Sequence, residues 1–443
     1  MTVEVILINK LRRFFKSLKS SAFVKNIQLF LGGRTFLAIT VLLIGVITAR
    51  LLTPENRGLY ALFFTISGLL VTLLHVGISP ANIYFLNNRK RDIGELLGNT
   101  LVYIAFASLL LFILFAIAVI YDFRGSFADL DPLQTWTMMW LVVLATLVEV
   151  SISGLIYGSN LYGFISRALI LQATLLLLAT LPIYFTADNL VYGLAFRVFA
   201  TCIFVTLFLK SFVAISVKKL KFSYPILKAQ LQFGSKNWVQ NIIGFFNVRS
   251  YVLILGLIAA PDVVGFFSVA WLFVELVRFV PDTIATMILP SLTSYKTDQE
   301  RTLLTVKSIK LICATTTLLA ILLIFLLQHV IPIVFGADYS PSVIIAKILV
   351  AGSIFGVIYQ VLTRYFTSIG KQIYSLIAAF IGLVIGSLCC VYLAPIYGGS
   401  GAAVSYLLSS VVTACISMYY FCSRSDTAFK EVIKFKKSDF SIN

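Results

Sequence analysis

Six basic residues lie inside segments of the sequence that are otherwise apolar, and few acids accompany them. The basic residues are Arg34, Arg197, Arg249, Arg278, Lys347 and Arg364, and the acids are Glu149 and Glu275, with Asp282 nearer a segment end. Each charge at a bilayer centre costs roughly 2.5–3.5 kcal/mol on insertion scales, so these side chains should face partners or a water-filled cavity. The positive excess favours an anionic ligand, and arginine binds such groups well through its planar donor fork. A drug-cation exporter would instead need acids there.

Arg249 is the strongest candidate for binding such an anion, because no acid lies within four residues of it. The segment that carries it has one broad polar side, made of Asn237, Gln240, Asn241, Gly244 and Asn247. The amides of Asn241 and Asn247 could contact a sugar. The alternative is a structural one, in which Arg249 forms a salt bridge to Glu149 or Glu275 on another helix.

The other charged positions allow similar alternatives. Glu275, Arg278 and Asp282 are spaced i, i+3, i+7 and could form an intrahelical ladder, or Glu275 or Glu149 could hold a coupling ion. Arg364 and Gln360 belong to a polar stripe that suits either substrate contact or helix packing. Arg34 and Lys347 lie near segment ends, where they could line a cavity or snorkel to the interface. Arg197 could pair with Glu149 on another helix.

Twelve apolar segments must position these residues. The 443 residues are 60% hydrophobic and 12% charged, with a mean hydropathy of +0.98, which is typical of an all-α integral membrane protein with many spans. Segments of roughly 20 apolar residues fit the bilayer core. They are 27–52, 59–86, 96–120, 135–157, 165–186, 190–212, 233–258, 262–289, 303–327, 341–369, 374–394 and 400–422.

The second half of the sequence repeats the first. Residues 52–60 recur as 259–267, with Gly58 matching Gly265, and residues 158–162 recur as 370–374. This pattern predicts two six-helix bundles of the same orientation, 27–212 and 233–422, and transporters with two such halves place their site between them. The flanking parts would be a basic amphipathic helix (1–26), a cytoplasmic linker (213–232) and a basic tail (423–443).

Lysine and arginine are distributed unevenly between the two predicted sides. Most lie in 10–25, 89–91, 210–236, 296–310 and 424–437, together with Arg167 and Lys371, and only Arg50, Arg57 and Arg124 lie opposite. The basic side is the cytoplasmic one, so both termini should be cytoplasmic. The formal net charge of +17 then reflects topology and anionic lipid rather than nucleic acid.

Signals for covalent chemistry are scarce. Asp129 and Asp131 form the only D-x-D motif. They could serve a glycosyltransferase or polymerase, but an aspartate before Pro132 is also a typical helix start. The chain has no phosphate-binding GxxxxGK[ST] motif, and its six cysteines fit small core positions. No catalytic residue, metal site or cofactor is expected.

Residues 48–62, from Thr48 through Pro54 and Gly58 to Leu62, resemble the first-hairpin signature of polysaccharide and lipid-linked oligosaccharide flippases of the O-antigen flippase (Wzx) type. Residues 261–270 with Glu275 resemble its second-half counterpart, and residues 333–339 resemble its outer loop before the tenth helix. The resemblance implies the MATE-like fold of the multidrug/oligosaccharidyl-lipid/polysaccharide (MOP) exporter superfamily, in which two six-helix bundles surround a cavity that opens alternately to each side. Lipid II flippases of this superfamily typically have fourteen helices, which argues against that branch.

These observations predict a transporter of the bacterial plasma (inner) membrane. It would move an undecaprenyl-pyrophosphate-linked oligosaccharide to the outer leaflet for surface polysaccharide biosynthesis, driven by H⁺, Na⁺ or the membrane potential. Expected partners are the lipid-linked oligosaccharide, the bilayer, a polysaccharide polymerase and a chain-length regulator. The alternatives are a MATE-like small-molecule antiporter and, from another class, a membrane glycosyltransferase or polymerase.

Overall fold

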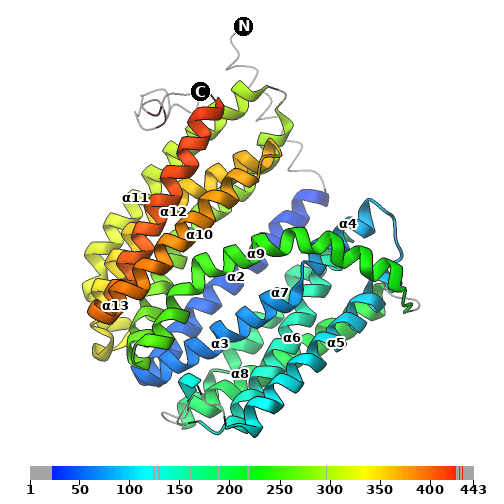
Figure 1. The fold of residues 1–443 in the computed structure, drawn as a ribbon, viewed down its shortest axis with the longest axis horizontal. Helices are drawn as coiled ribbons and strands as arrows, with labels where there is room; N and C mark the ends of the chain where they lie inside the picture. The colour runs from blue at the N-terminus through cyan, green and yellow to red at the C-terminus, as the bar shows by residue number, and fades with distance from the viewer. Residues whose placement is uncertain are drawn as a thin grey trace. The chain divides into compact units, whose positions relative to one another are not determined.

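The computed structural model describes residues 22–425, apart from 123–124, 128–129, 160, 187–189, 217–219 and 296, and also Phe429 and Val432. Most of the predicted basic helix 1–26 and most of the tail 423–443 lie outside the described residues. Within the described residues, every regular element is a helix (Figure 1). Ten of these helices are long and apolar enough to cross a membrane. The all-α membrane class is thus confirmed.

The chain forms two compact units. The first unit contains residues up to Leu51 and Phe63–Ile242. Its helices are α2 (Ala22–Leu51), most of α3 (Pro54–His75), α4 (Ile78–Asn87), α5 (Ile93–Ile120), α6 (Pro132–Gly158), α7 (Tyr162–Leu178), α8 (Leu190–Ser216) and the beginning of α9 (Tyr224–Ile258), with the short 3-10 helices η1 (Gly125–Phe127) and η2 (Leu181–Thr186). Helix α6 packs against α4, α5 and α8, and their shared core includes Leu97, Ile152 and Phe212.

The second unit contains Leu52–Leu62 and residues from Ile243 onwards. Its elements are the start of α3, the rest of α9, α10 (Pro261–Ser294), α11 (Asp298–Phe335), η3 (Ala337–Tyr339), α12 (Ser342–Ser368) and α13 (Ile373–Ser425). Helix α12 packs against α10, α11 and α13, and these helices run from green through yellow to red in Figure 1. The buried core here includes Ile312, Leu362, Phe366 and Phe421.

Local backbone features explain where the helices differ from the predicted segments. Segment 59–86 is divided into α3 and α4 by a turn in which Val76 and Gly77 have positive φ angles of 42° and 68°. Segments 374–394 and 400–422 correspond to the two parts of α13, which meet at Gly398, where the backbone is not helical and φ is 57°. Pro395 lies just before that point and cannot donate a helical hydrogen bond.

The predicted linker is not a separate connection between compact units. Helix α9 begins at Tyr224, inside the predicted linker, and continues to Ile258. The first unit extends to Ile242, whereas Leu52–Leu62 belongs to the second unit. The boundaries 27–212 and 233–422 therefore stay a prediction about repeated halves, and they do not coincide with the compact units.

The two copies of the repeated sequence pack directly against each other within the second unit. Helices α3 and α10 begin at Pro54 and Pro261, and a glycine follows four residues later in each, Gly58 and Gly265. A Cβ on Gly58 would overlap the carbonyl oxygen of Pro261, and a Cβ on Gly265 would overlap that of Pro54. This reciprocal contact confirms that the two glycines occupy equivalent positions. Superposition of the complete halves by rotation about the membrane normal stays a prediction.

Tyr339 fixes the same region from the loop between α11 and α12. Its side chain is only 2% exposed, and its phenol donates a hydrogen bond to the carbonyl oxygen of Leu52 at 3.2 Å. Burial raises the pKa of Tyr339 to about 12. The phenol therefore keeps its proton at physiological pH and remains a donor.

The predicted membrane orientation gives a direct labelling test. A cysteine at Tyr121, which is 80% exposed at the end of α5, should react with a membrane-impermeant maleimide in intact cells, because this end is predicted to face outward. A cysteine at Arg89, exposed between α4 and α5, should react only after permeabilisation. Both would be placed in a variant without the six native cysteines. The reverse pattern would overturn the orientation.

Candidate functional site in the second unit

Arg249 forms an ion pair with Glu275, which joins α9 to α10. The shortest distance, between Nη2 and Oε1, is 3.5 Å, and the two side chains keep exposed fractions of 38% and 44%. Arg249 therefore forms the salt bridge to Glu275 that the sequence allowed as the structural alternative. The pair is nevertheless not enclosed, so both groups stay accessible to a ligand.

Arg278 on α10 and Arg364 on α12 both lie in the neighbourhood of Tyr359. Both guanidinium charges lie close enough to act on the Tyr359 hydroxyl, which donates to the carbonyl oxygen of Ser375 at 3.4 Å. The Nε of Arg364 is buried and has no hydrogen-bond partner among the described residues. A buried donor left unsatisfied costs about 1–3 kcal/mol, which a ligand oxygen would recover.

The expected ladder along α10 is corrected by these contacts. Glu275 pairs with Arg249 on α9 rather than with Arg278 on its own helix. Because Glu275 and Arg278 are three residues apart, they still lie on one face of α10. We refer to Arg249, Arg278 and Arg364, together with Glu275, as the arginine cluster; it has three positive charges and one negative charge.

Two polar candidates, Asn247 and Gln360, differ in whether their side chains already form hydrogen bonds with other described residues. The side-chain nitrogen of Asn247 donates to the carbonyl oxygens of Ile243 at 2.9 Å and Ala379 at 3.2 Å. It therefore holds α9 against α13, and only its side-chain oxygen remains for a sugar. Gln360 is half-buried beside Tyr359 on α12. The binding roles of both stay predictions.

The remaining predicted site residues belong to the first unit. Asn241 on α9 and Arg34 on α2 are exposed. Glu149 on α6 accepts a hydrogen bond from Gln172 on α7 at 2.9 Å. Arg197 lies over the ring of Phe64, with 4.2 Å between the guanidinium carbon and the ring centroid, and its pairing with Glu149 stays a prediction. Their roles in binding or ion coupling stay predictions.

A buried polar network in the first unit was not predicted from the sequence. Asn82 on α4, Asn99 and Thr100 on α5 and Gln230 on α9 are at most 1% exposed. The Gln230 amide donates to Asn82 at 2.7 Å, the Asn99 amide donates to Gln230 at 3.2 Å, and Asn82 also donates to the Ser151 carbonyl oxygen on α6 at 3.1 Å. Uncharged polar residues inside apolar segments were the signal that could have revealed it.

The described half of the D-x-D motif, Asp131, has the structural role of a helix start. Asp131 is the N-cap of α6, and its carboxylate accepts a hydrogen bond from the backbone nitrogen of Gln134 at 3.1 Å. Asp129 lies outside the described residues. An N-cap carboxylate held in this way is already used in stabilising a helix end, which weakens the case for a glycosyltransferase acid at this position.

Comparison with known proteins agrees with the fold. Residues 47–344 match the family described as "Polysaccharide biosynthesis protein". The structure is similar to a lipid II flippase MurJ in an inward closed conformation, with a TM-score of 0.71, 14% identity and coverage of 93% of this chain and 94% of that one. It is also similar to an inward-facing multidrug resistance MATE family transporter of the MOP superfamily, with a TM-score of 0.65, 15% identity and coverage of 88% and 94%.

A third similar structure is that of a mutant of the Vibrio cholerae MATE transporter VcmN, with a TM-score of 0.60, 13% identity and coverage of 95% of this chain and 99% of that one. A search of curated proteins gives no match. At these identities the structural neighbours establish the fold alone, whereas the family match spans more than half of the 443 residues. The chain therefore belongs to the polysaccharide biosynthesis protein family and has the fold of MOP-superfamily transporters.

Proposed function

We propose that the protein is a flippase that moves a lipid-linked oligosaccharide, carried on undecaprenyl pyrophosphate, across the bacterial plasma membrane. The sugar and pyrophosphate would pass along polar protein surface while the prenyl chain stays in the lipid. No bond is made or broken in this process, so the protein needs to supply binding and a conformational change. The membrane potential, worth about 2.3 kcal/mol per charge per 100 mV, or a coupling cation, H⁺ or Na⁺, would drive the cycle.

The positive excess of the arginine cluster is the observation that carries this proposal. Glu275 offsets Arg249, whereas neither Arg278 nor Arg364 forms an ion pair with an acid of the described residues. Two such guanidinium groups in a membrane-spanning helical unit suit a pyrophosphate, which can accept several charge-assisted hydrogen bonds. A transporter for organic cations would need the opposite balance of charge.

The cluster can be tested through Arg364. In a strain that lacks the chromosomal gene, Arg364→Ala should reduce surface glycan by about ten- to a hundredfold, equivalent to losing about 1.5–3 kcal/mol of charged hydrogen bonding, while protein accumulates normally in the membrane. Arg364→Lys should be intermediate, because it keeps the charge and loses the planar fork. Lys307→Ala, which removes an exposed charge from α11, is the control and should export normally.

The Arg249–Glu275 pair requires a double variant in the same assay. Arg249→Ala leaves Glu275 unpaired, and combining it with Glu275→Gln removes that penalty. If Arg249 contacts the substrate, the double variant accumulates but exports no glycan. Restored export in the double variant would assign the pair to structure alone, and full export by Arg364→Ala would remove the cluster from the substrate path.

A further inference from the structure

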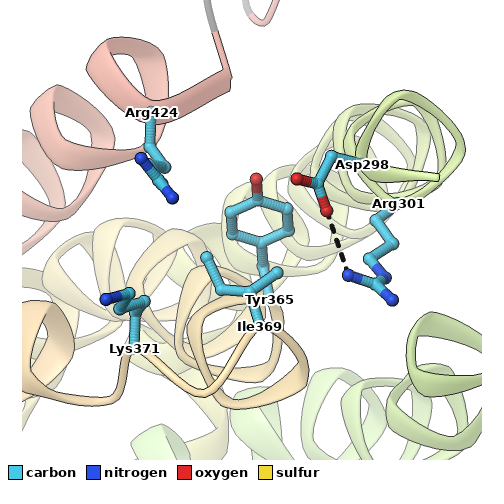
Figure 2. Close-up of a pocket in the computed structure, with 6 residues that line it drawn as sticks. All are labelled: Asp298, Arg301, Tyr365, Ile369, Lys371 and Arg424. Atoms are coloured by element: carbon cyan, nitrogen blue, oxygen red, sulfur yellow. Dashed lines mark hydrogen bonds and ion pairs between the residues drawn. The ribbon is translucent and has the colours of Figure 1, made fainter. Parts of the chain in front are cut away.

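A second basic site, which shares no residue with the arginine cluster, lies in the second unit. A cavity of about 360 Å³ is lined by Asp298, Arg301, Tyr365, Ile369, Lys371 and Arg424. These residues come from the start of α11, the end of α12, the turn after it and the end of α13. Figure 2 shows Lys371 and Arg424 on one side of the Tyr365 ring and the Asp298–Arg301 pair on the other. We call this cavity the basic pocket.

Arg301 forms a fixed wall of the basic pocket. Its Nη1 lies 3.0 Å from Asp298, its Nη2 donates to the carbonyl oxygen of Tyr295 at 2.7 Å, and its Nε is buried without a partner among the described residues. The side chain is only 20% exposed. Arg301 is thus oriented by two contacts, and it pairs with Asp298, the one acid among the described residues that line the pocket.

Lys371 and Arg424 supply the uncompensated charge of the pocket. Both side chains are exposed, and neither forms an ion pair with another described residue. With Asp298 offsetting Arg301, the lining has an excess of two positive charges. Such a concentration of charge attracts anions, and the combination of an arginine fork and a lysine point charge is typical of phosphate binding.

The turn after α12 holds Lys371 in place. Gly370 has a positive φ of 70°, the nitrogen of Lys371 donates to the carbonyl oxygen of Phe366 at 2.8 Å, and that of Gly370 donates to Thr367 at 3.1 Å. These two bonds form a Schellman motif, a helix end that favours glycine at this position. The backbone that carries Lys371 is therefore determined by local hydrogen bonds and does not depend on a ligand.

We propose that the basic pocket binds a phosphate group, either from the head group of an anionic membrane lipid or from a free phosphate compound. Residues 296–310, Lys371 and the tail are predicted to lie on the cytoplasmic side, where anionic lipid is enriched. Ile369 offers an apolar contact beside the charges, which suits the glycerol portion of a lipid head group. The lining of the pocket shares no residue with the arginine cluster, and the proposal does not depend on which molecule that cluster transports.

The test uses the purified full-length protein in detergent and measures affinity by titration. The probes are inorganic pyrophosphate, a short-chain phosphatidylglycerol and a neutral short-chain diacylglycerol. The variant Lys371→Gln/Arg424→Gln should bind the phosphate probes about a hundredfold more weakly, tenfold for each contact of about 1.4 kcal/mol. The control Arg89→Gln/Lys307→Gln removes the same charge from two exposed positions that do not line the pocket, and it should bind like the wild type.

The probes distinguish the source of the phosphate. Binding of phosphatidylglycerol alone identifies a lipid head group, and binding of pyrophosphate identifies a site open to free phosphate compounds. The proposal is overturned if neither phosphate probe binds the wild type, if diacylglycerol binds as well as phosphatidylglycerol, or if the pocket variant and the control bind equally. Because no glycan export is measured, failure here leaves the proposed transport function untouched, and failure of the export assay leaves the pocket untouched.

Discussion

Alanine at Gly58 should abolish accumulation of the folded protein. The added Cβ would overlap the carbonyl oxygen of Pro261, a backbone atom that cannot rotate away as a flexible side chain could. Overpacking typically costs about 1–3 kcal/mol and more where the neighbour cannot yield. Gly265→Ala should have the same effect, because its Cβ would overlap the carbonyl oxygen of Pro54. Size-exclusion chromatography of a fluorescent fusion, extracted in detergent, measures the amount of monodisperse protein.

Gly244→Ala is the matched control for this experiment. Gly244 also lies within a helix of the second unit, but apart from its own helical turn no atom of the described residues lies within 4 Å of the position that a Cβ would take there. Alanine at this position should leave accumulation unchanged or improve it, since alanine favours a helix over glycine by about 1 kcal/mol. Normal yields of Gly58→Ala would show that the two repeated segments need not approach so closely.

Leucine at Asn82 should cause the next largest loss of stability. Leucine is similar in size but removes the acceptor for Gln230 and the donor to the Ser151 carbonyl oxygen. Each polar group left unsatisfied in a buried position costs about 1–3 kcal/mol, so we expect a total loss of about 3 kcal/mol or more. The measurement is the midpoint of thermal unfolding in detergent.

Asn241→Leu provides the comparison, because Asn241 is exposed and lies outside this network. Its unfolding midpoint should stay close to that of the wild type. If Asn82→Leu unfolds at the same temperature as Asn241→Leu, the hydrogen bonds among Asn82, Asn99 and Gln230 contribute nothing to the stability of the first unit.

The features that could be predicted from sequence are those set by local composition. Apolar runs of bilayer length reveal most spans, and the repeated Pro-x-x-x-Gly sequence correctly placed Gly58 and Gly265 at equivalent points of α3 and α10. The helix start at Pro132 followed from Asp131 and its capping chemistry. In each case the residues that decide the structure are neighbours in the sequence.

Features that depend on residues far apart in the sequence could not be predicted. Spacing along α10 favoured a partner for Glu275 on its own helix, but the approach of α9 provides Arg249 instead. Lys371 and Arg424 were recognised as basic residues of one side, yet only the packing of α11, α12 and α13 places them around one cavity. The division of segment 59–86 is different, because Gly77 and Pro80 stand at the break and were a local signal that the prediction did not use.

The Asn82 network also has a consequence for biosynthesis. Gln230 follows Asn82 by 148 residues, and at about 5–20 residues per second a ribosome needs roughly 7–30 s to make that interval. During that time Asn82 can use only partners made earlier or soon after it, such as Thr100 and Ser151. The amides of Asn82 and Asn99 thus enter the bilayer before their last partner exists, and the arrival of α9 completes the first unit late in translation.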